Sequence, residues 1–256
     1  MKRRNFITLV CGAAATWPLS ARTQQRERMR RIGVLMNFAA GDPAGQARLI
    51  AFVQGLQHLG WTEGHNAHID VRWGAGDAEQ IRKSVAELVT LAPDVILASG
   101  SPTTGPLLQA TRTIPIVFVQ VADPVGAGFV ENLAHPKGNA TGFTNFEYGI
   151  AGKWLELLKQ IAPRVTRAAV LRDPAVTSGT GQLGAIQSVA PSFGVELSPI
   201  NSRDVVEIEG AISDFAERPN GGLIVTAGGL VVHRELIITL AGRYKLPALT
   251  RIVSSS

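Results

Sequence analysis

Hydroxyl side chains gather in one short segment that could bind a small anion. An apolar run, 94–98, predicts a buried strand, and four hydroxyl residues follow it: Ser99, Ser101, Thr103 and Thr104. Ser101 suits the N-cap of a helix, and Pro102 suits its first turn. The free N–H groups of such a helix start, together with the hydroxyls, could hold a carboxylate. A simple helix cap is the alternative, and the sequence leaves both open.

Polar residues also follow other predicted strands. Asp123 and Asp173, each before a proline, come after the apolar runs 116–119 and 168–171, and Thr226 follows the run 223–225. A carboxylate in such a place could accept a ligand ammonium, although Asp before Pro also starts ordinary turns. Because ligands of parallel sheets bind beyond the carboxyl ends of the strands, the repetition of polar loops there favours a binding site.

Three aromatic residues, Phe143, Phe146 and Tyr148, stand in an irregular stretch in the middle of the chain. They could line a cleft for an apolar or aromatic part of a ligand, or pack between two lobes.

Motifs for catalysis and cofactor binding are absent from the sequence. The five histidines show no metal-ligand spacing, and no phosphate-binding, dinucleotide, zinc-protease or nucleophile-elbow motif occurs. We therefore predict no catalytic residue, no metal and no cofactor.

Apolar runs alternate along the chain with segments of helical periodicity. The run 32–36 predicts a strand, and Leu49, Phe52, Val53, Leu56 and Leu59 then share one helical stripe. Asp77 and Gln80 form a capping box for the next helix. The β-α-β-α order continues to about residue 244 and predicts an α/β fold of two Rossmann-like lobes with parallel sheets.

A stretch rich in Gly and Pro interrupts this order and predicts the lobe boundaries. We expect a first lobe over 30–123, an inter-lobe crossover over 124–145 and a second lobe over 146–249.

The N-terminus has the layout of a bacterial export signal. Arg3 and Arg4 precede a short apolar run from Leu9 to Leu19, which predicts a leader of the twin-arginine type over 1–23, cleaved near 21–23. The run is too short to span a bilayer. The only cysteine, Cys11, lies inside this leader, so the mature protein would contain no disulfide.

The charge balance also changes when the leader is removed. The chain has 25 Lys and Arg against 20 Asp and Glu, and four of the basic residues precede Thr23, which leaves 21 against 20. A near-neutral mature chain does not indicate a nucleic-acid partner.

An ordered set of short motifs resembles one family. The set comprises 17–19, 31–35, 60–61, 91–96, 115–118, 123–126, 138–142 and 153–158. Together they look like the solute-binding components of ABC importers of the tryptophan/tyrosine type, from the leader to about Pro247. The resemblance implies a fold like that of type I periplasmic binding proteins, a monomer in the periplasm, a membrane permease as partner and a small solute, possibly an aromatic amino acid, as ligand.

The resemblance also implies which residues face the inter-lobe cleft. They are the loop Ser99–Thr104, Asp123, the segment Phe143, Thr144 and Asn145, and Asp173 and Thr226. Members of the family continue beyond the segment that resembles 243–248, so the resemblance further implies that the C-terminal part is missing, with a second lobe that is incomplete and a divergent tail over 250–256. An exported α/β enzyme acting on a small molecule is the alternative function.

Overall fold

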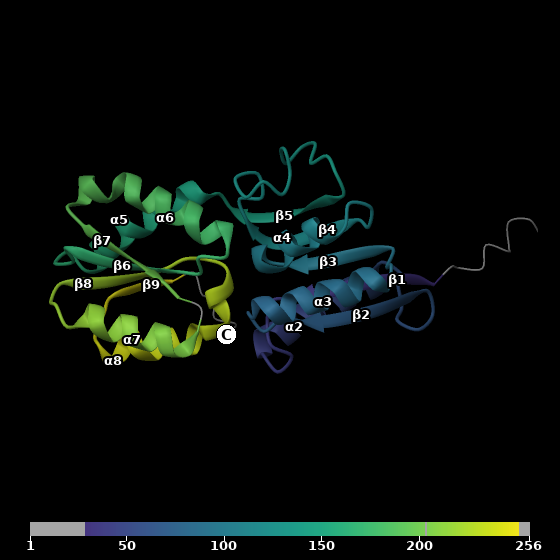
Figure 1. Cartoon of the computed structure of the whole chain (residues 1–256), viewed down its shortest axis with the longest axis horizontal. Coiled ribbons are helices and arrows are strands. Elements are labelled where there is room, and N and C mark those ends of the chain that lie inside the picture. The colour runs from purple at the N-terminus through teal and green to yellow at the C-terminus, as the bar shows by residue number, and fades with distance from the viewer. Residues whose placement is uncertain (1–28, 203, 251–256) are drawn as a thin grey trace, which may run out of the picture.

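The computed structural model describes residues 29–202 and 204–250, which form two lobes side by side along the long axis (Figure 1). The predicted export signal, its cleavage site near 21–23 and nearly all of the predicted tail lie outside these residues.

The first lobe is built on a five-stranded sheet with the order β2-β1-β3-β4-β5, in which every pairing is parallel. Its strands are β1 (Arg30–Met36), β2 (Ala67–Trp73), β3 (Val95–Ser99), β4 (Ile116–Ala122) and β5 (Ala140–Phe146). Its helices are α2 (Pro43–His58), α3 (Ala78–Thr90) and α4 (Ser101–Ala110).

Helices cover both faces of this sheet because its inner strands are apolar on both sides. In β1, Leu35 packs with the buried stripe of α3, while Val34 and Met36 pack on the other face with the apolar side of α2. The N-cap half of the predicted capping box is present, since the Asp77 carboxylate accepts a hydrogen bond from the Gln80 N–H at 2.6 Å, but the Gln80 side chain donates to the Ser84 hydroxyl at 3.5 Å instead of reaching back to Asp77.

The second lobe has a four-stranded parallel sheet with the order β7-β6-β8-β9. Its strands are β6 (Arg167–Arg172), β7 (Glu196–Asn201), β8 (Gly221–Val225) and β9 (Ala248–Thr250). Helices α5 (Ala151–Ile161) and α6 (Thr177–Val189) cover one face, and α7 (Val205–Ala216) and α8 (Arg234–Arg243) cover the other (Figure 1). Short 3-10 turns are η3 (Tyr148–Ile150), η4 (Ala190–Phe193) and η5 (Gly229–His233).

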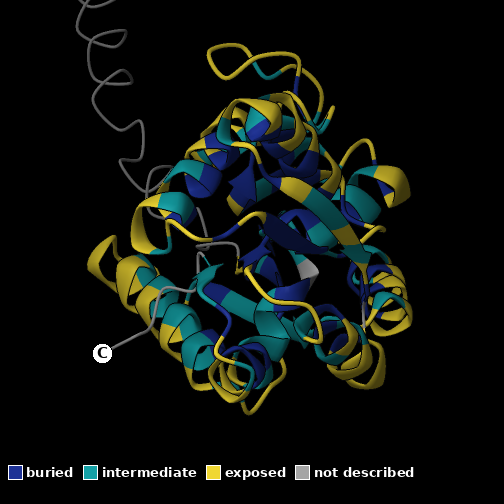
Figure 2. Cartoon of the chain, turned by 90° about the vertical axis from the view of Figure 1, so that its left-hand side faces the viewer, coloured by how far each residue is buried: buried dark blue, intermediate teal, exposed yellow. Residues whose placement is uncertain are grey.

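The α/β fold with parallel sheets is confirmed, and the two lobes repeat the same strand order. Strands β2-β1-β3-β4 in the first lobe correspond in order to β7-β6-β8-β9 in the second. Figure 2 shows the burial of this fold, with buried strands inside and the outer faces of the helices exposed.

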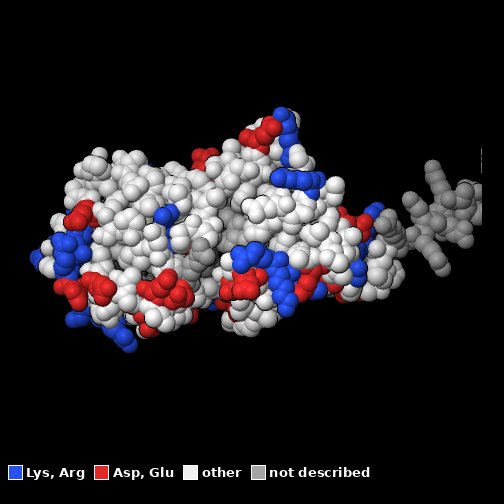
Figure 3. Space-filling model, viewed as in Figure 1, with Lys and Arg blue, Asp and Glu red and all other residues white. Residues whose placement is uncertain are grey.

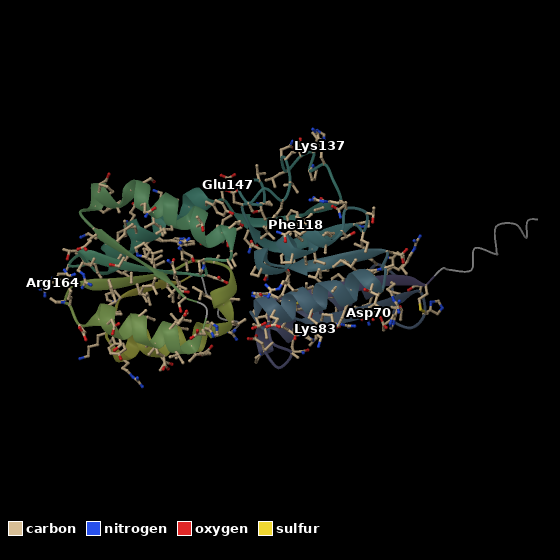
Figure 4. The ribbon with its side chains drawn as sticks, in the orientation of Figure 1. Asp70, Lys83, Phe118, Lys137, Glu147 and Arg164 are labelled. Atoms are coloured by element: carbon tan, nitrogen blue, oxygen red, sulfur yellow. The ribbon has the colours of Figure 1, made fainter. Side chains whose placement is uncertain are left out.

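The predicted crossover over 124–145 is wrong. Strand β5 pairs in parallel with β4 and so belongs to the sheet of the first lobe. The irregular stretch before β5 therefore connects two neighbouring strands of that lobe. Lys137 lies on this outward loop, whereas Glu147 lies at the junction of the lobes (Figure 4). The chain therefore passes to the second lobe over 147–150. The sequence concealed β5 because most of this edge strand is exposed and its residues form no apolar run.

A glycine in β5 permits this edge pairing. A Cβ atom built on Gly142 would overlap the backbone carbonyl oxygen of Phe118 in β4, which cannot move without breaking the ladder. We expect Gly142→Ala to destabilise the protein by about 1–3 kcal/mol, as overpacking does. Urea denaturation followed by circular dichroism measures this change.

The matched control is Gly184→Ala inside α6, where an added Cβ meets nothing within 4 Å. It should raise stability by up to about 1 kcal/mol through helix propensity. Equal stability of the two variants would contradict the assigned pairing of β5.

Candidate functional site

A cavity of about 200 Å³ lies between the lobes and is lined by both of them. The first lobe contributes Asn37, Phe38, Arg48, Ser99, Ser101, Gln120 and Asn145 among others. The second contributes Ser178, Thr226, Ala227, Leu230, Val231 and Arg234 among others.

The topology explains the position of the cavity. In the first sheet β2 lies on one side of β1 and β3 on the other, and in the second sheet β7 and β8 flank β6 in the same way. The direction of the strand order thus reverses between β1 and β3 and between β6 and β8. The loops that follow the two strands at such a reversal run to opposite sides of the sheet and leave a crevice between them. Asn37 directly follows β1 and Thr226 directly follows β8, so each lobe presents the carboxyl edge of its sheet to the other.

The hydroxyl segment 99–104 is divided between the cavity and the core. Ser99 and Ser101 line the cavity, whereas Thr103 and Thr104 are fully buried and donate their hydroxyl hydrogen bonds to the Gly100 carbonyl oxygen at 3.0 and 2.9 Å. The predicted cap at Ser101 is wrong by one residue, because Gly100, with a φ of 91°, occupies the N-cap and Ser101 is the first residue of α4.

Asp123 is a turn residue and does not line the cavity. Its backbone is left-handed, with a φ of 43°, and its carboxylate accepts hydrogen bonds from the N–H groups of Gly126 at 2.7 Å and Tyr148 at 3.3 Å. These bonds fix the loop after β4 to the start of the passage between the lobes. The predicted ammonium contact at Asp123 is therefore replaced by the turn that the sequence left open as its alternative.

Strand β5 brings one of its three predicted residues to the cavity. Asn145 lines it, but Phe143 is 73% exposed on the outside, and the Thr144 hydroxyl donates to the Val121 carbonyl oxygen at 3.1 Å. The neighbouring Phe146 lines the cavity and packs edge-to-face on Trp154 of α5, with ring centroids 5.8 Å apart.

In the second lobe, Thr226 lines the cavity and Asp173 does not. The Thr226 hydroxyl donates to the Leu171 carbonyl oxygen at 3.1 Å, which holds β8 against β6. Asp173 is buried and accepts a hydrogen bond from the Ala175 N–H at 2.9 Å, so it shapes the turn after β6. Ser178 reaches the cavity and donates to the Ala227 carbonyl oxygen at 3.1 Å.

Several cavity residues were missed by the sequence analysis. Asn37 and Phe38 carry the same signal as Ser99, because they follow an apolar strand, and the carboxyl-end rule could have found them. Arg48 and Arg234 stand within helical segments, where no local pattern distinguishes them from surface residues.

An ion pair joins the lobes beside the cavity. Arg234 of α8 donates to both carboxylate oxygens of Asp42, at 2.8 and 3.4 Å, and the two side chains are only 16% and 12% exposed. Asp42 is also the N-cap of α2 and accepts from the N–H groups of Ala44 and Gly45. Burial favours the protonated acid, but the bonds from Arg234 and these N–H groups outweigh burial and lower the pKa of Asp42. The η5 residue Val231 adds an apolar contact to the first-lobe cluster around Phe38.

Among residues 29–202 and 204–250, no helix has both the length and the apolar character needed to cross a bilayer. The same residues contain no group of three or more His, Cys, Asp or Glu side chains placed to hold a metal ion. On the face drawn in Figure 3, acidic and basic side chains lie beside one another along the lower edge of both lobes. That face therefore carries a mixed charge.

Comparison with known proteins agrees with this geometry. Residues 35–255 match the family described as ABC transporter substrate binding protein. The chain belongs to this family.

Similar proteins include a tyrosine-binding protein of Clostridioides difficile, 26% identical over 196 residues that make up 77% of this chain and 56% of that protein. The chain thus spans about half the length of this curated relative. A conserved domain protein of Vibrio cholerae is 26% identical, with a TM-score of 0.79 over 89% of this chain and 75% of that one. The ABC domain of a Streptococcus pneumoniae protein in complex with L-Trp is 21% identical, with a TM-score of 0.76 over 86% and 73%, and shares the fold.

The ion pair predicts a pH-dependent effect of one substitution. Asp42→Asn keeps a good N-cap residue but removes the charge. We expect the free energy of unfolding to fall by about 1–2 kcal/mol at pH 7. Hydrogen bonds to charged groups contribute about 1.5–3 kcal/mol, and the lower value applies because this ion pair retains some solvent contact. Because folding lowers the pKa of Asp42, this stabilisation is present above the unfolded pKa of about 4 and disappears as the pH falls through the folded pKa.

Urea denaturation at pH 7 and pH 3 measures the difference between wild type and variant. Asp77→Asn, at an N-cap whose carboxylate bonds the Gln80 N–H, is the control and should change stability little at either pH. A difference for Asp42→Asn that persists undiminished at pH 3 would show that the charge is not its source.

Proposed function

We propose that this chain is the solute-binding component of an ABC importer. It captures a small solute between its two lobes and delivers it to a membrane permease. It acts as a monomer in the periplasm and binds its solute without converting it.

The observation that carries this proposal is a cavity to which both lobes contribute polar and apolar residues, several of them at strand ends. A solute that contacts both walls favours the conformations in which the walls are close, and the passage over 147–150 is the short connection about which the lobes can move. Membership of the substrate-binding family supports the same role.

The lining suits a ligand with an apolar body and polar ends. Phe38, Phe146 and Leu230 provide apolar surface, while Ser99, Ser101, Asn145 and Thr226 provide hydrogen-bonding groups from the set that the sequence predicted. The tyrosine-binding relative and the L-Trp complex make aromatic amino acids the first ligands to test.

Asn145 provides a test of this assignment. We expect L-tyrosine or L-tryptophan to raise the melting temperature of the protein, because a ligand present at 100 times its Kd stabilises the folded state by about 2.7 kcal/mol. Asn145→Ala should weaken the affinity about fivefold, as the loss of one hydrogen bond does, while Thr141→Ala on the same strand should not. Isothermal titration calorimetry measures both.

Two outcomes would contradict the assignment. Equal effects of the two substitutions would remove Asn145 from the site. Recovery of a chemically altered compound after incubation would favour the exported enzyme instead.

The export assignment has its own test. Replacing Arg3 and Arg4 with lysine should abolish export by a twin-arginine route and leave the unprocessed chain in the cytoplasm. Cell fractionation with mass spectrometry of the N-terminus follows the location and the cleavage. Lys2→Arg serves as the control and should leave export intact; normal processing of the twin-lysine variant would exclude the twin-arginine route.

A further inference from the structure

Two residues that line the cavity each carry a polar atom that is buried without a protein partner. These atoms are Nη1 of Arg48 and Oδ1 of Asn37. Asn37 is only 3% exposed. A buried donor or acceptor that lacks a partner is costly and therefore rare in folded proteins. Here one such atom belongs to a cation and the other is a neutral acceptor, and a ligand bound against these two residues could satisfy both.

The carboxylate that acts on Arg48 is already hydrogen-bonded to another arginine. Asp42 is the carboxylate that acts on Arg48 and Arg234 together, and it is bonded directly to Arg234 through both of its oxygens. Burial lowers the pKa of Arg48, Asp42 opposes this effect, and the positive charge of Arg234 adds to it. Arg234 also lies 3.6 Å from the carboxylate of Glu235, but that side chain is 83% exposed. The less exposed carboxylate, Asp42, is engaged by Arg234, which leaves the charge of Arg48 available to an anion in the cavity.

Neighbouring groups hold Arg48 in place. Its guanidinium lies over the ring of Phe38, 4.6 Å from the ring centre, and Phe38 is itself buried. Gly45 allows α2 to approach this ring, since an added Cβ would lie 2.7 Å from the Phe38 Cβ. Asn37 and Phe38 are consecutive residues after β1, so the strand end that carries the free acceptor also orients the free cation.

We propose that Arg48 binds a carboxylate group of the solute and that Asn37 Oδ1 accepts a hydrogen bond from an N–H or O–H group of the same molecule. The ligand class is a small carboxylate that carries a hydrogen-bond donor, such as an amino acid. This inference rests on the proposed function, of which it specifies the ligand. It assigns the carboxylate to α2 rather than to the start of α4, and the donor group to Asn37 rather than to Asp123.

The experiment compares compounds that differ by one group. Thermal shift and calorimetry would use the twenty amino acids, benzoate and lactate, each beside a partner without the carboxylate, for example L-tyrosine beside tyramine. For every carboxylate compound that binds, we expect the matching compound without the carboxylate not to bind. Arg48→Met should weaken binding about tenfold to a hundredfold, the usual effect of losing hydrogen bonds to a charged group.

Further variants separate recognition from structure. Arg82→Met, at an exposed arginine of α3, is the matched control and should bind like wild type. Arg48→Lys keeps the charge without the forked geometry and should bind with intermediate affinity. Without ligand, Arg48→Met should melt no lower than wild type, because it removes a buried cation that lacks a full partner. Asn37→Ala should weaken L-tyrosine but not 3-(4-hydroxyphenyl)propanoate, which lacks the amino group.

The outcomes distinguish this inference from the proposed function. Tight binding of a compound without a carboxylate, or carboxylate binding that Arg48→Met leaves unchanged, would overturn the inference while the solute-binding role stands. A lower melting temperature of ligand-free Arg48→Met with unchanged affinity would assign Arg48 to packing on Phe38 alone. A panel in which no compound binds the wild type would count against both.

Discussion

Parallel pairing is the constraint on which the rest of the structure depends. Every strand in both sheets runs in the same direction as its neighbours, so all carboxyl ends of a sheet lie at one edge. The chain must return to the other edge after each strand, and the loops and helix starts where it turns carry the polar residues. With the two sheets facing each other by these edges, the polar ends of both lobes surround one cavity.

The contacts between the lobes combine polar and apolar groups. Each lobe has its own buried apolar clusters, whereas the junction includes the pair of Asp42 with Arg234, Val231 beside the cluster of Phe38, and Phe146 of β5 on Trp154 of α5. Interfaces of this kind permit relative motion of domains, because little apolar area is lost when they open. The ion pair lies next to the cavity, so a change in the charge of the ligand site acts directly on the contact that joins the lobes.

Site residues divide into those that hold loops and those that remain free. Asp123, Asp173 and Thr104 have the residue types of a binding site, but their polar atoms are used in turns and caps. Arg48 and Asn37, which line the cavity, each retain a buried atom without a partner. A buried unpaired atom on a residue that lines the cavity, rather than residue type alone, thus marks these two residues as candidate ligand contacts.

The sequence by itself determined the α/β class, the order of most helices and strands, and the strand ends at which polar residues belong, because hydrophobic periodicity and capping residues are local properties. It placed Ser99, Ser101 and Thr226 at strand ends for that reason, and the family resemblance added Asn145; all four line the cavity. Only the tertiary structure decided that β5 joins the first sheet, that Asp123 closes a turn, and that Arg48, Asp42 and Arg234 meet. Asp42 and Arg234 are 192 residues apart. A charge pair between lobes leaves no local pattern, since its energy depends on the distance and burial that folding creates.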